Sequence, residues 1–139
     1  MTRSREDYMK AILYLSRDDK YVSNKQLAER LKVNAASVTD MILKLDQDNY
    51  VDYTPYYGVK LTPTGRAYAT RVLRNHRIWE VFLCDKLGYT PSEVHEKAEI
   101  LEHYVSDEFV NRLDAYLNHP SLCPHGNTIP RQNEELTEK

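Results

Sequence analysis

The sequence has little of what builds disulfide scaffolds, phosphate loops or membrane spans. Its 139 residues include two cysteines, Cys84 and Cys123, which are too few for a disulfide framework and suit a reducing cytoplasm. No run of about 18 apolar residues occurs, so we expect no membrane span. No apolar segment follows the charged N-terminus, so we expect no signal peptide. With four glycines in total, the chain offers no glycine-rich loop for phosphate binding.

The two parts of the chain carry opposite net charges, because acidic residues are fewer in the first part and basic residues are fewer in the second. Residues 1–77 carry 14 Lys/Arg against 9 Asp/Glu, a net charge of +5. Residues 78–139 carry 5 against 12, a net charge of −7. A basic excess suits a polyanionic partner and an acidic excess suits cations. The length allows one compact domain or two small helical units that share a core.

The first part of the sequence predicts a helix-turn-helix followed by a hairpin. Helical periodicity predicts helices over residues 4–16, 24–31 and 35–48, with Ser23 or Asn24 capping the second helix and Asn34 the third. Such a short connection between the second and third helices is typical of a helix-turn-helix. Two β-prone runs, 50–53 and 59–61, flank a turn that contains Gly58 and predict a β-hairpin wing.

A winged helix-turn-helix places the start of its second helix in the major groove of DNA. Small side chains there permit close approach, hydroxyls can bond to bases, and lysines and wing tyrosines can lie along the phosphates. Winged helices also act as protein-interaction modules, but the basic excess of this part favours DNA. The candidate DNA-binding residues are Lys25, Ala35, Ala36, Ser37, Thr39, Asp40, Lys44, Tyr56, Tyr57 and Lys60.

The second part of the sequence predicts three helices, over residues 63–87, 92–104 and 106–117. Thr62 caps the first of them and Pro63 occupies its first position. Residues 88–91 break the chain between the first and second helices. Cys84 falls among apolar positions of its helix, so we expect it in the core. Residues 121–130 are predicted to be irregular.

Carboxylates and imidazoles gather in the stretch 95–103. At 100° per residue, four of its side chains fall in one arc of the predicted helix: His95, Glu99, Glu102 and His103. Two carboxylates on one face repel each other unless a positive charge lies between them. With the imidazoles they form a donor set suited to a divalent transition metal. His76 and Glu80 repeat the pairing one helix earlier, which favours metal binding over a solvated acidic face.

The sequence argues against two kinds of enzyme. Residues 95–99 nearly spell the H-E-x-x-H motif of zinc peptidases, but the last position is Glu99. No Gly-x-Ser-x-Gly nucleophile elbow is present. We therefore expect no enzyme. The alternatives kept open are a metal-independent winged-helix regulator, whose acidic half only dimerises, and a small metal-dependent hydrolase.

Several short motifs occur together along residues 4–130. They are Glu6-Asp7-Tyr8, Ala36-Ser37-Val38-Thr39, Leu61-Thr-Pro-Thr-Gly-Arg66, His76-Arg77-x-x-Glu80, Val94-His95-Glu96, Glu102-His103 with Ser106-Asp107-Glu108, and Gly126-Asn127-x-Ile129-Pro130. Jointly they resemble the metal-dependent repressors typified by the diphtheria toxin repressor and the manganese transport regulator. The resemblance implies a homodimer with a winged-helix DNA-binding domain and a helical dimerisation domain. It also implies that metal binds between the domains and makes the dimer competent for its operator.

The resemblance also implies a primary metal site. Its ligands would be Asp7, Glu99, Glu102 and His103, with His76 nearby. Iron-responsive members of the family carry Met and Cys where this chain has Asp7 and Glu99, and hard oxygen ligands favour Mn²⁺. Fe²⁺, Co²⁺, Cd²⁺ and Zn²⁺ are the alternative ions. One manganese-responsive branch has a Glu at the position of Lys10, which argues against the closely spaced two-manganese cluster of that branch.

A second metal site is implied around Glu80. Its other ligands would be His76 or His95, or else Cys123 and His125, and the sequence leaves this choice open. The pair Cys123 and His125 resembles longer manganese-responsive members, which add a ligand from a C-terminal SH3-like domain. The sequence also leaves open whether the chain is a short family form or a truncation that lacks such a domain.

The sequence as a whole predicts a mainly α protein. We expect a winged helix-turn-helix DNA-binding domain over residues 1–72, a helical metal-binding and dimerisation domain over 73–130, and a flexible tail over 131–139. The expected protein is a cytoplasmic homodimer without a membrane partner. It would act as a manganese-activated transcriptional repressor of metal-ion uptake genes, bound to palindromic double-stranded operator DNA.

Overall fold

A computed structural model describes residues 3–16 and 20–131 as two compact units, with Thr70 in the first and Arg71 in the second. The described residues are mainly helical with one small sheet, which confirms the predicted fold class. None of the described helices is long and apolar enough to cross a membrane. The domain bounds 1–72 and 73–130 stay predictions, and residues 132–139 of the predicted tail lie outside the described residues.

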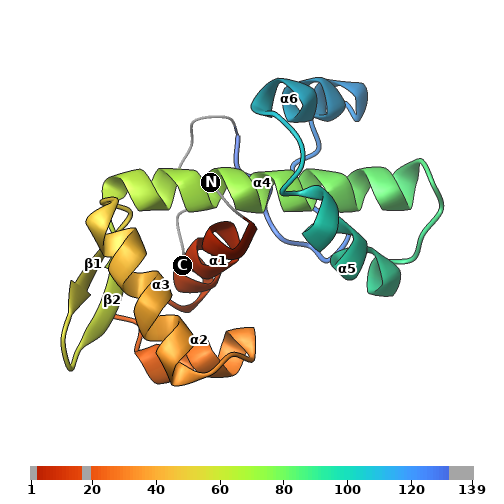
Figure 1. Cartoon of the computed structure of the whole chain (residues 1–139). Coiled ribbons are helices and arrows are strands. Elements are labelled where there is room, and N and C mark those ends of the chain that lie inside the picture. The colour runs from red at the N-terminus through yellow and green to blue at the C-terminus, as the bar shows by residue number, and fades with distance from the viewer. Residues whose placement is uncertain (1–2, 17–19, 132–139) are drawn as a thin grey trace. The chain divides into compact units, whose positions relative to one another are not determined.

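The first unit contains three helices and a two-stranded hairpin (Figure 1). The elements are α1 (Arg3–Leu15), α2 (Asn24–Leu31), α3 (Ala35–Gln47), β1 (Val51–Thr54) and β2 (Gly58–Leu61). The strands pair antiparallel, with Val51 opposite Leu61. The apolar stripes of the helices and the inner face of the hairpin form a core that includes Met9, Ile12, Leu27, Ile42, Leu45 and Val59.

Local hydrogen bonds position α3 after α2. The Ser23 hydroxyl accepts a bond from the Gln26 backbone N–H, and the Gln26 side chain accepts one from the Ser23 N–H, which forms a capping box at the start of α2. Lys32 takes a left-handed conformation, with a φ of 56°, and ends the helix. Two residues later the Asn34 side chain accepts from the Ser37 N–H and starts α3. The predicted helix-turn-helix is therefore confirmed.

The hairpin depends on a glycine at the start of β2. Gly58 has a φ of 116°, and an added Cβ would lie 2.1 Å from the Val22 carbonyl oxygen. The close approach lets the Val22 N–H donate to the Val59 oxygen at 2.8 Å and the Val59 N–H donate to the Val22 oxygen at 2.9 Å. The turn that precedes Gly58 exposes Tyr56 and Tyr57 at the tip of the wing.

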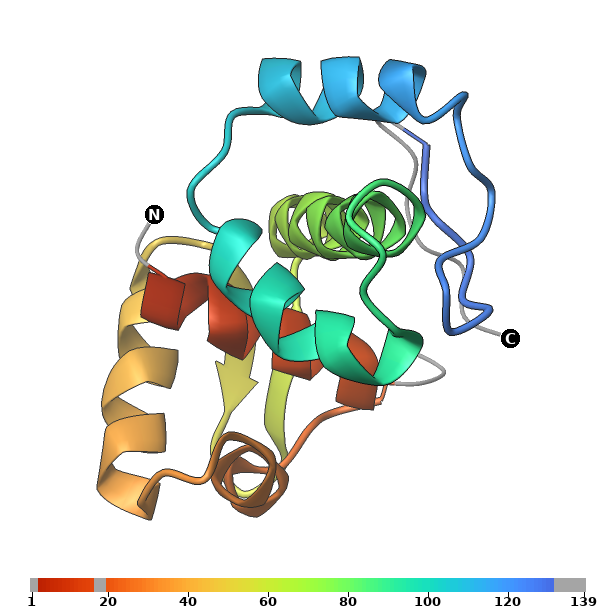
Figure 2. The same cartoon turned by 90° about the vertical axis from the view of Figure 1, so that its right-hand side faces the viewer.

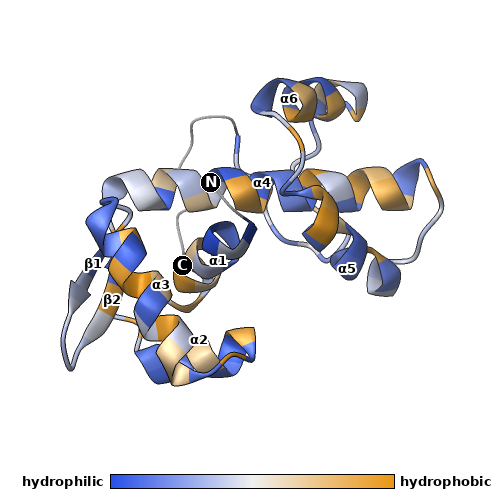
Figure 3. Ribbon diagram, in the orientation of Figure 1, coloured by the Kyte–Doolittle hydropathy of each residue, from blue (hydrophilic) through white to orange (hydrophobic). Residues whose placement is uncertain are grey.

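The second unit contains most of α4 (Pro63–Asp85), together with α5 (Pro91–Leu101) and α6 (Asp107–Tyr116). The Thr62 hydroxyl accepts from the Gly65 N–H at 3.0 Å, so Thr62 begins α4 as predicted. Figure 2 shows α5 and α6 on opposite sides of α4. Apolar residues recur along all three helices (Figure 3) and form a core that includes Ile78, Val81, Leu83, Val94, Ala98 and Val110. Cys84 packs against this core, as expected.

The predicted helix over residues 92–104 is too long at its C-terminal end. The helix α5 ends at Leu101, and Glu102 is its cap. The Tyr104 N–H bonds to the Leu101 oxygen at 3.2 Å, which closes a tight turn, and Ser106 then caps α6. The placement of His103 on one helical arc with Glu102 is therefore wrong, because His103 lies in this turn.

Residues 118–131, which we name the 118–131 loop, fold back on themselves without forming a helix. The Ile129 N–H donates to the Ser121 oxygen at 2.9 Å, and the Cys123 N–H donates to the Asn127 oxygen at 2.9 Å. The turn at the tip contains Gly126, whose φ is 82°. Only isolated β-bridge pairing occurs in this segment, in agreement with the irregular structure predicted over residues 121–130.

Candidate metal centre and nucleic-acid interface

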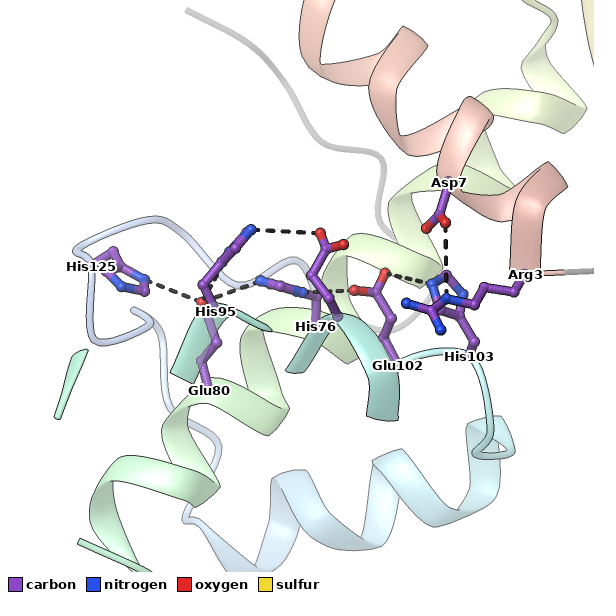
Figure 4. A network of polar contacts seen from close by, with 9 residues as sticks. Arg3, Asp7, His76, Glu80, His95, Glu102, His103 and His125 are labelled. Atoms are coloured by element: carbon purple, nitrogen blue, oxygen red, sulfur yellow. Dashed lines mark hydrogen bonds and ion pairs between the residues drawn. The ribbon is translucent and has the colours of Figure 1, made fainter. Parts of the chain in front are cut away.

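His76 lies at the centre of a buried polar network in the second unit (Figure 4). Its Nδ1 is 2.7 Å from Oε1 of Glu102, the cap of α5, and its Nε2 is 3.2 Å from Oε2 of Glu80, one turn further along α4. Each of the two glutamates is only 2% exposed. Both imidazole nitrogens therefore face carboxylate oxygens that are shielded from water.

Glu80 receives imidazoles from three segments of the second unit. Besides His76, its Oε2 lies 3.2 Å from Nδ1 of His125 in the 118–131 loop and 3.9 Å from Nδ1 of His95 on α5. Burial alone raises the pKa of Glu80, but the hydrogen bond from His76 and the charges of His76, His125 and His95 outweigh burial and hold the pKa below its ordinary value. With a lowered pKa, the side chain is a carboxylate anion at neutral pH.

The orientation of His125 suits metal binding. Its Nε2 lies 2.7 Å from the carbonyl oxygen of Pro91. A carbonyl oxygen only accepts hydrogen bonds, so Nε2 carries a proton, and Nδ1 is the ring nitrogen on the side of Glu80 that could bind an ion. Histidines that bind metals commonly hold their second ring N–H in this way on a backbone carbonyl.

Three groups of described residues can each hold a metal ion, with ligand atoms that all lie within 4.8 Å of one another. The groups are His76, Glu80 and His95; Glu80, Cys123 and His125; and His76, Glu99 and Glu102. Ligands that share one ion at about 2.0–2.3 Å are at most about 4.6 Å apart, so small side-chain movements suffice. Oxygen and imidazole ligands suit manganese, and the thiol of Cys123 adds a softer donor.

The residues predicted for the primary site are only partly brought together, since the groups of described residues include Glu99 and Glu102 but neither His103 nor Asp7. The Oε1 of Glu99 lies 3.6 Å from Nε2 of His95, and the Oε2 of Glu102 lies 3.8 Å from Nε2 of His103. The His103 side chain is buried. Asp7 belongs to α1 of the first unit, where its Oδ2 is 3.9 Å from Nε of Arg3. The joint ligation of one ion by Asp7 and the residues of the second unit stays a prediction.

The predicted DNA-binding residues lie on α2, α3 and the wing. Most are exposed, which leaves them available to a partner: Lys25, Ala35, Ala36, Ser37, Asp40, Lys44, Tyr56 and Tyr57. Two are half-buried. The Thr39 hydroxyl accepts a 3.5 Å bond from the Asn24 amide, and the Lys60 Nζ lies 4.7 Å from the centroid of the Tyr21 ring. These two residues therefore also serve contacts within the first unit.

Sequence reasoning missed a second polar cluster, formed by Arg74, Asp114, His119 and Arg131 at the base of the 118–131 loop. Arg131 was assigned to the predicted tail, yet its guanidinium contacts both Asp114 and the Pro120 carbonyl. No local pattern signals this cluster, because its members are single charged residues separated by turns and helices. Only the burial of Asp114 distinguishes it from an ordinary surface carboxylate.

Both units match one protein family. Residues 1–59 match the domain described as "Iron dependent repressor, N-terminal DNA binding domain", and residues 62–131 match "Iron dependent repressor, metal binding and dimerisation domain". The buried network of His76, Glu80 and Glu102 falls within the second of these regions.

Curated relatives agree with this match. An uncharacterised HTH-type transcriptional regulator of Methanocaldococcus jannaschii is 35% identical over 118 residues, which cover 84% of this chain and 94% of that protein. The HTH-type transcriptional regulator MntR of Listeria monocytogenes is 36% identical over 123 residues, 86% of each chain. The diphtheria toxin repressor of Corynebacterium diphtheriae is 34% identical over 129 residues, 93% of this chain and 57% of that protein.

Solved structures resemble the whole described fold. The manganese regulator SloR superposes with a TM-score of 0.87 and 47% sequence identity, and the match covers 100% of this chain and 65% of that one. ScaR with bound Zn²⁺ gives a TM-score of 0.84 and 43% identity, with coverage of 97% and 63%. The chain thus spans less than two thirds of these longer proteins. On these matches, the chain belongs to the iron-dependent repressor family of the diphtheria toxin repressor and MntR, whose members are transcriptional repressors and not enzymes.

Proposed function

We propose that the protein is a manganese-activated, DNA-binding transcriptional repressor that controls genes for metal-ion uptake. The observation that supports this proposal is the buried network around His76, whose two ring nitrogens face Glu80 and Glu102 and which contributes to two of the three groups of described residues that could hold an ion. This network falls within the region that matches the family's metal-binding domain. As a regulator of operator DNA, the protein is proposed to act in the cytoplasm as a homodimer. The matched metal-binding region is also described as a dimerisation domain.

Manganese is the ion that the donor set favours. The group His76, Glu99 and Glu102 presents two carboxylates and one imidazole, and hard oxygen ligands suit Mn²⁺. The primary site of the proposal is Asp7, Glu99, Glu102 and His103, and the second site is Glu80 with either Cys123 and His125 or His76 and His95. Among relatives, SloR is named a manganese regulator, and ScaR has been solved with Zn²⁺ and with Cd²⁺. Zn²⁺, Cd²⁺, Fe²⁺ and Co²⁺ are therefore the proposed substitutes.

A bound cation would remove the repulsion between neighbouring carboxylates in the second unit. Glu99 and Glu102 are both within 4.8 Å of the His76 ring nitrogen that completes their group, and Glu102 and Glu80 are almost fully buried. Buried like charges are costly without a counter-charge. The metal is proposed to supply that counter-charge and thereby stabilise the arrangement that is competent for DNA binding.

The DNA contacts are proposed to come from α2, α3 and the wing. Exposed Ala35, Ala36 and Ser37 at the N-terminus of α3 are small enough for base edges to approach closely. In a homodimer, two such helices would read half-sites about 34 Å, or one turn of DNA, apart. A palindromic operator follows from that symmetry.

Selection of DNA from a random pool tests the proposal. Rounds of binding in Mn²⁺ are expected to enrich an inverted repeat with half-site centres about 10 base pairs apart. A parallel selection in chelator serves as the control and is expected to enrich no repeat. The proposal fails if neither selection yields a motif, or if both yield the same motif with equal enrichment.

Ser37 and Lys44 are expected to contribute differently to DNA binding. A phosphate contact releases counterions, so Lys44→Ala should reduce the slope of log affinity against log salt by about one unit for each subunit's lost contact. Ser37→Ala should leave that slope unchanged but should alter which bases are preferred at the positions that α3 contacts. Lys97→Ala, which removes an exposed lysine from α5 of the second unit, is the matched control. An unchanged slope for Lys44→Ala in a fluorescence titration would exclude Lys44 from the phosphate contacts.

A further inference from the structure

The base of the 118–131 loop closes on one buried carboxylate. Asp114 of α6 is 4% exposed. Its Oδ2 lies 2.8 Å from Nδ1 of His119, 3.3 Å from Nη1 of Arg131 and 3.6 Å from Nη2 of Arg74. The Arg74 side chain is as deeply buried as that of Asp114, whereas Arg131 is half-buried and His119 is exposed. One carboxylate thus gathers three cationic or potentially cationic side chains.

These contacts join both ends of the loop to α4. His119 lies at the start of the loop and Arg131 at its end, and the second guanidinium nitrogen of Arg131 donates to the Pro120 carbonyl at 2.8 Å. Arg74 connects the same carboxylate to α4, the helix that carries His76 and Glu80. The loop base therefore has a defined position on the helix that supplies ligands to the proposed second metal site.

The far end of the loop carries Cys123 and His125. Within the loop, backbone hydrogen bonds join its outgoing and returning halves. Arg77 of α4 also donates a hydrogen bond to the Thr128 carbonyl. Closing such a loop costs conformational entropy, which increases if its ends are free to separate. The positions of Cys123 and His125 next to Glu80 therefore depend on contacts made at the base.

We propose that Asp114, together with Arg131 and Arg74, is a positioning group for the second metal site. By holding both ends of the 118–131 loop on α4, it places Cys123 and His125 at ligand distance from Glu80. Asp114 is absent from the three groups of described residues that can hold an ion, so it acts through the loop. The inference rests on the proposed function, specifically on a second site that uses Cys123 and His125.

Cobalt titration of the full chain provides a readout that is specific for this site. Co²⁺ bound to a thiolate absorbs in the near ultraviolet, so the band reports ligation by Cys123, while Co²⁺ bound only to oxygen and nitrogen lacks it. Asp114→Asn and Arg131→Met are expected to weaken the Co²⁺ affinity that accompanies the thiolate band by about 10- to 100-fold, as is typical when a group that orients a metal ligand is removed. Sulfur-free Co²⁺ binding should stay within about twofold of the wild type, since the group His76, Glu99 and Glu102 does not include the loop.

Glu108→Gln is the matched control, because Glu108 lies on the same helix and forms an exposed ion pair with Arg112. It should leave the thiolate band and its affinity unchanged. Asp114→Asn can disturb folding, because it leaves the buried Arg74 without its carboxylate. Arg131→Met then decides, since it removes a half-exposed charge at the loop end and leaves the Asp114–Arg74 pair in place.

Each outcome bears on the proposal differently. The proposal is supported if Arg131→Met weakens the Co²⁺ binding that produces the thiolate band, while sulfur-free Co²⁺ binding and thermal stability are retained. If both variants bind Co²⁺ with wild-type affinities, the positioning role is overturned, but the proposed second metal site is not. Equal weakening of all Co²⁺ binding also overturns it, because Asp114 would then serve only general stability. The Cys123→Ser variant should show no thiolate band. If the wild type also shows none, both the proposed Cys123 site and the positioning role of Asp114 are overturned.

Discussion

Chelation of divalent metal is expected to lower the affinity of the protein for its selected operator by between about 5- and 150-fold, the usual range for coupling between two binding sites. The physical reason is the concentration of carboxylates in the second unit, where Glu80 and Glu102 are each 2% exposed. Without a bound cation, the nearest cationic or potentially cationic partners of these carboxylates are imidazoles: His76 lies 2.7 Å from Glu102, and His76 and His125 each lie 3.2 Å from Glu80. The proportion of the protein in the DNA-binding arrangement should fall accordingly.

Fluorescence anisotropy with labelled operator measures this effect. Readdition of Mn²⁺ should restore the affinity, whereas Mg²⁺, which requires an octahedral oxygen site and keeps its waters, should not. Binding to unselected DNA depends on phosphate charges and salt and should change little with chelator. Equal operator affinity in chelator and in Mn²⁺ would rule out metal activation and favour the metal-independent regulator.

Glu80→Gln is expected to abolish the second metal site while the first is retained. Glu80 belongs to two of the three groups that can hold an ion, and its Oε2 lies 3.2 Å from both His76 and His125. The amide lacks the charge of the carboxylate, so affinity at this site should fall by at least about 100-fold, the upper end of the losses seen when only a supporting group is removed. Calorimetric titration with Mn²⁺ should then detect one ion fewer per chain.

Glu96→Gln is the matched control for this experiment. Glu96 is exposed on α5 and belongs to none of the three groups among the described residues, so the same change of charge should leave the Mn²⁺ stoichiometry unaltered. The group His76, Glu99 and Glu102 does not include Glu80, so both proteins should keep the first site. A Glu80→Gln variant that binds as many ions as the wild type, with equal affinities, would remove Glu80 from the ligands.

Local sequence signals were sufficient for most of the secondary structure. The capping box of Ser23 and Gln26, the Asn34 cap and the Thr62 cap each act over three residues, so the start of each helix is encoded next to it. The wing likewise depends on Gly58, the residue that tolerates the conformation and close approach required there. Where the end of a helix depends on a turn, as at Leu101, the prediction was three residues too long.

The sequence by itself determined the helix-turn-helix, the wing, the family and the candidate carboxylates and imidazoles for metal binding, because each depends on a short motif or on the spacing of side chains along one helix. Only the tertiary structure decided that imidazoles from α4, α5 and the 118–131 loop converge on Glu80, and that Asp114 holds the base of that loop. Asp114 and Arg131 are 17 positions apart. Such pairs leave no periodic signal, because their proximity results from the burial of apolar surface that packs α5, α6 and the loop around α4.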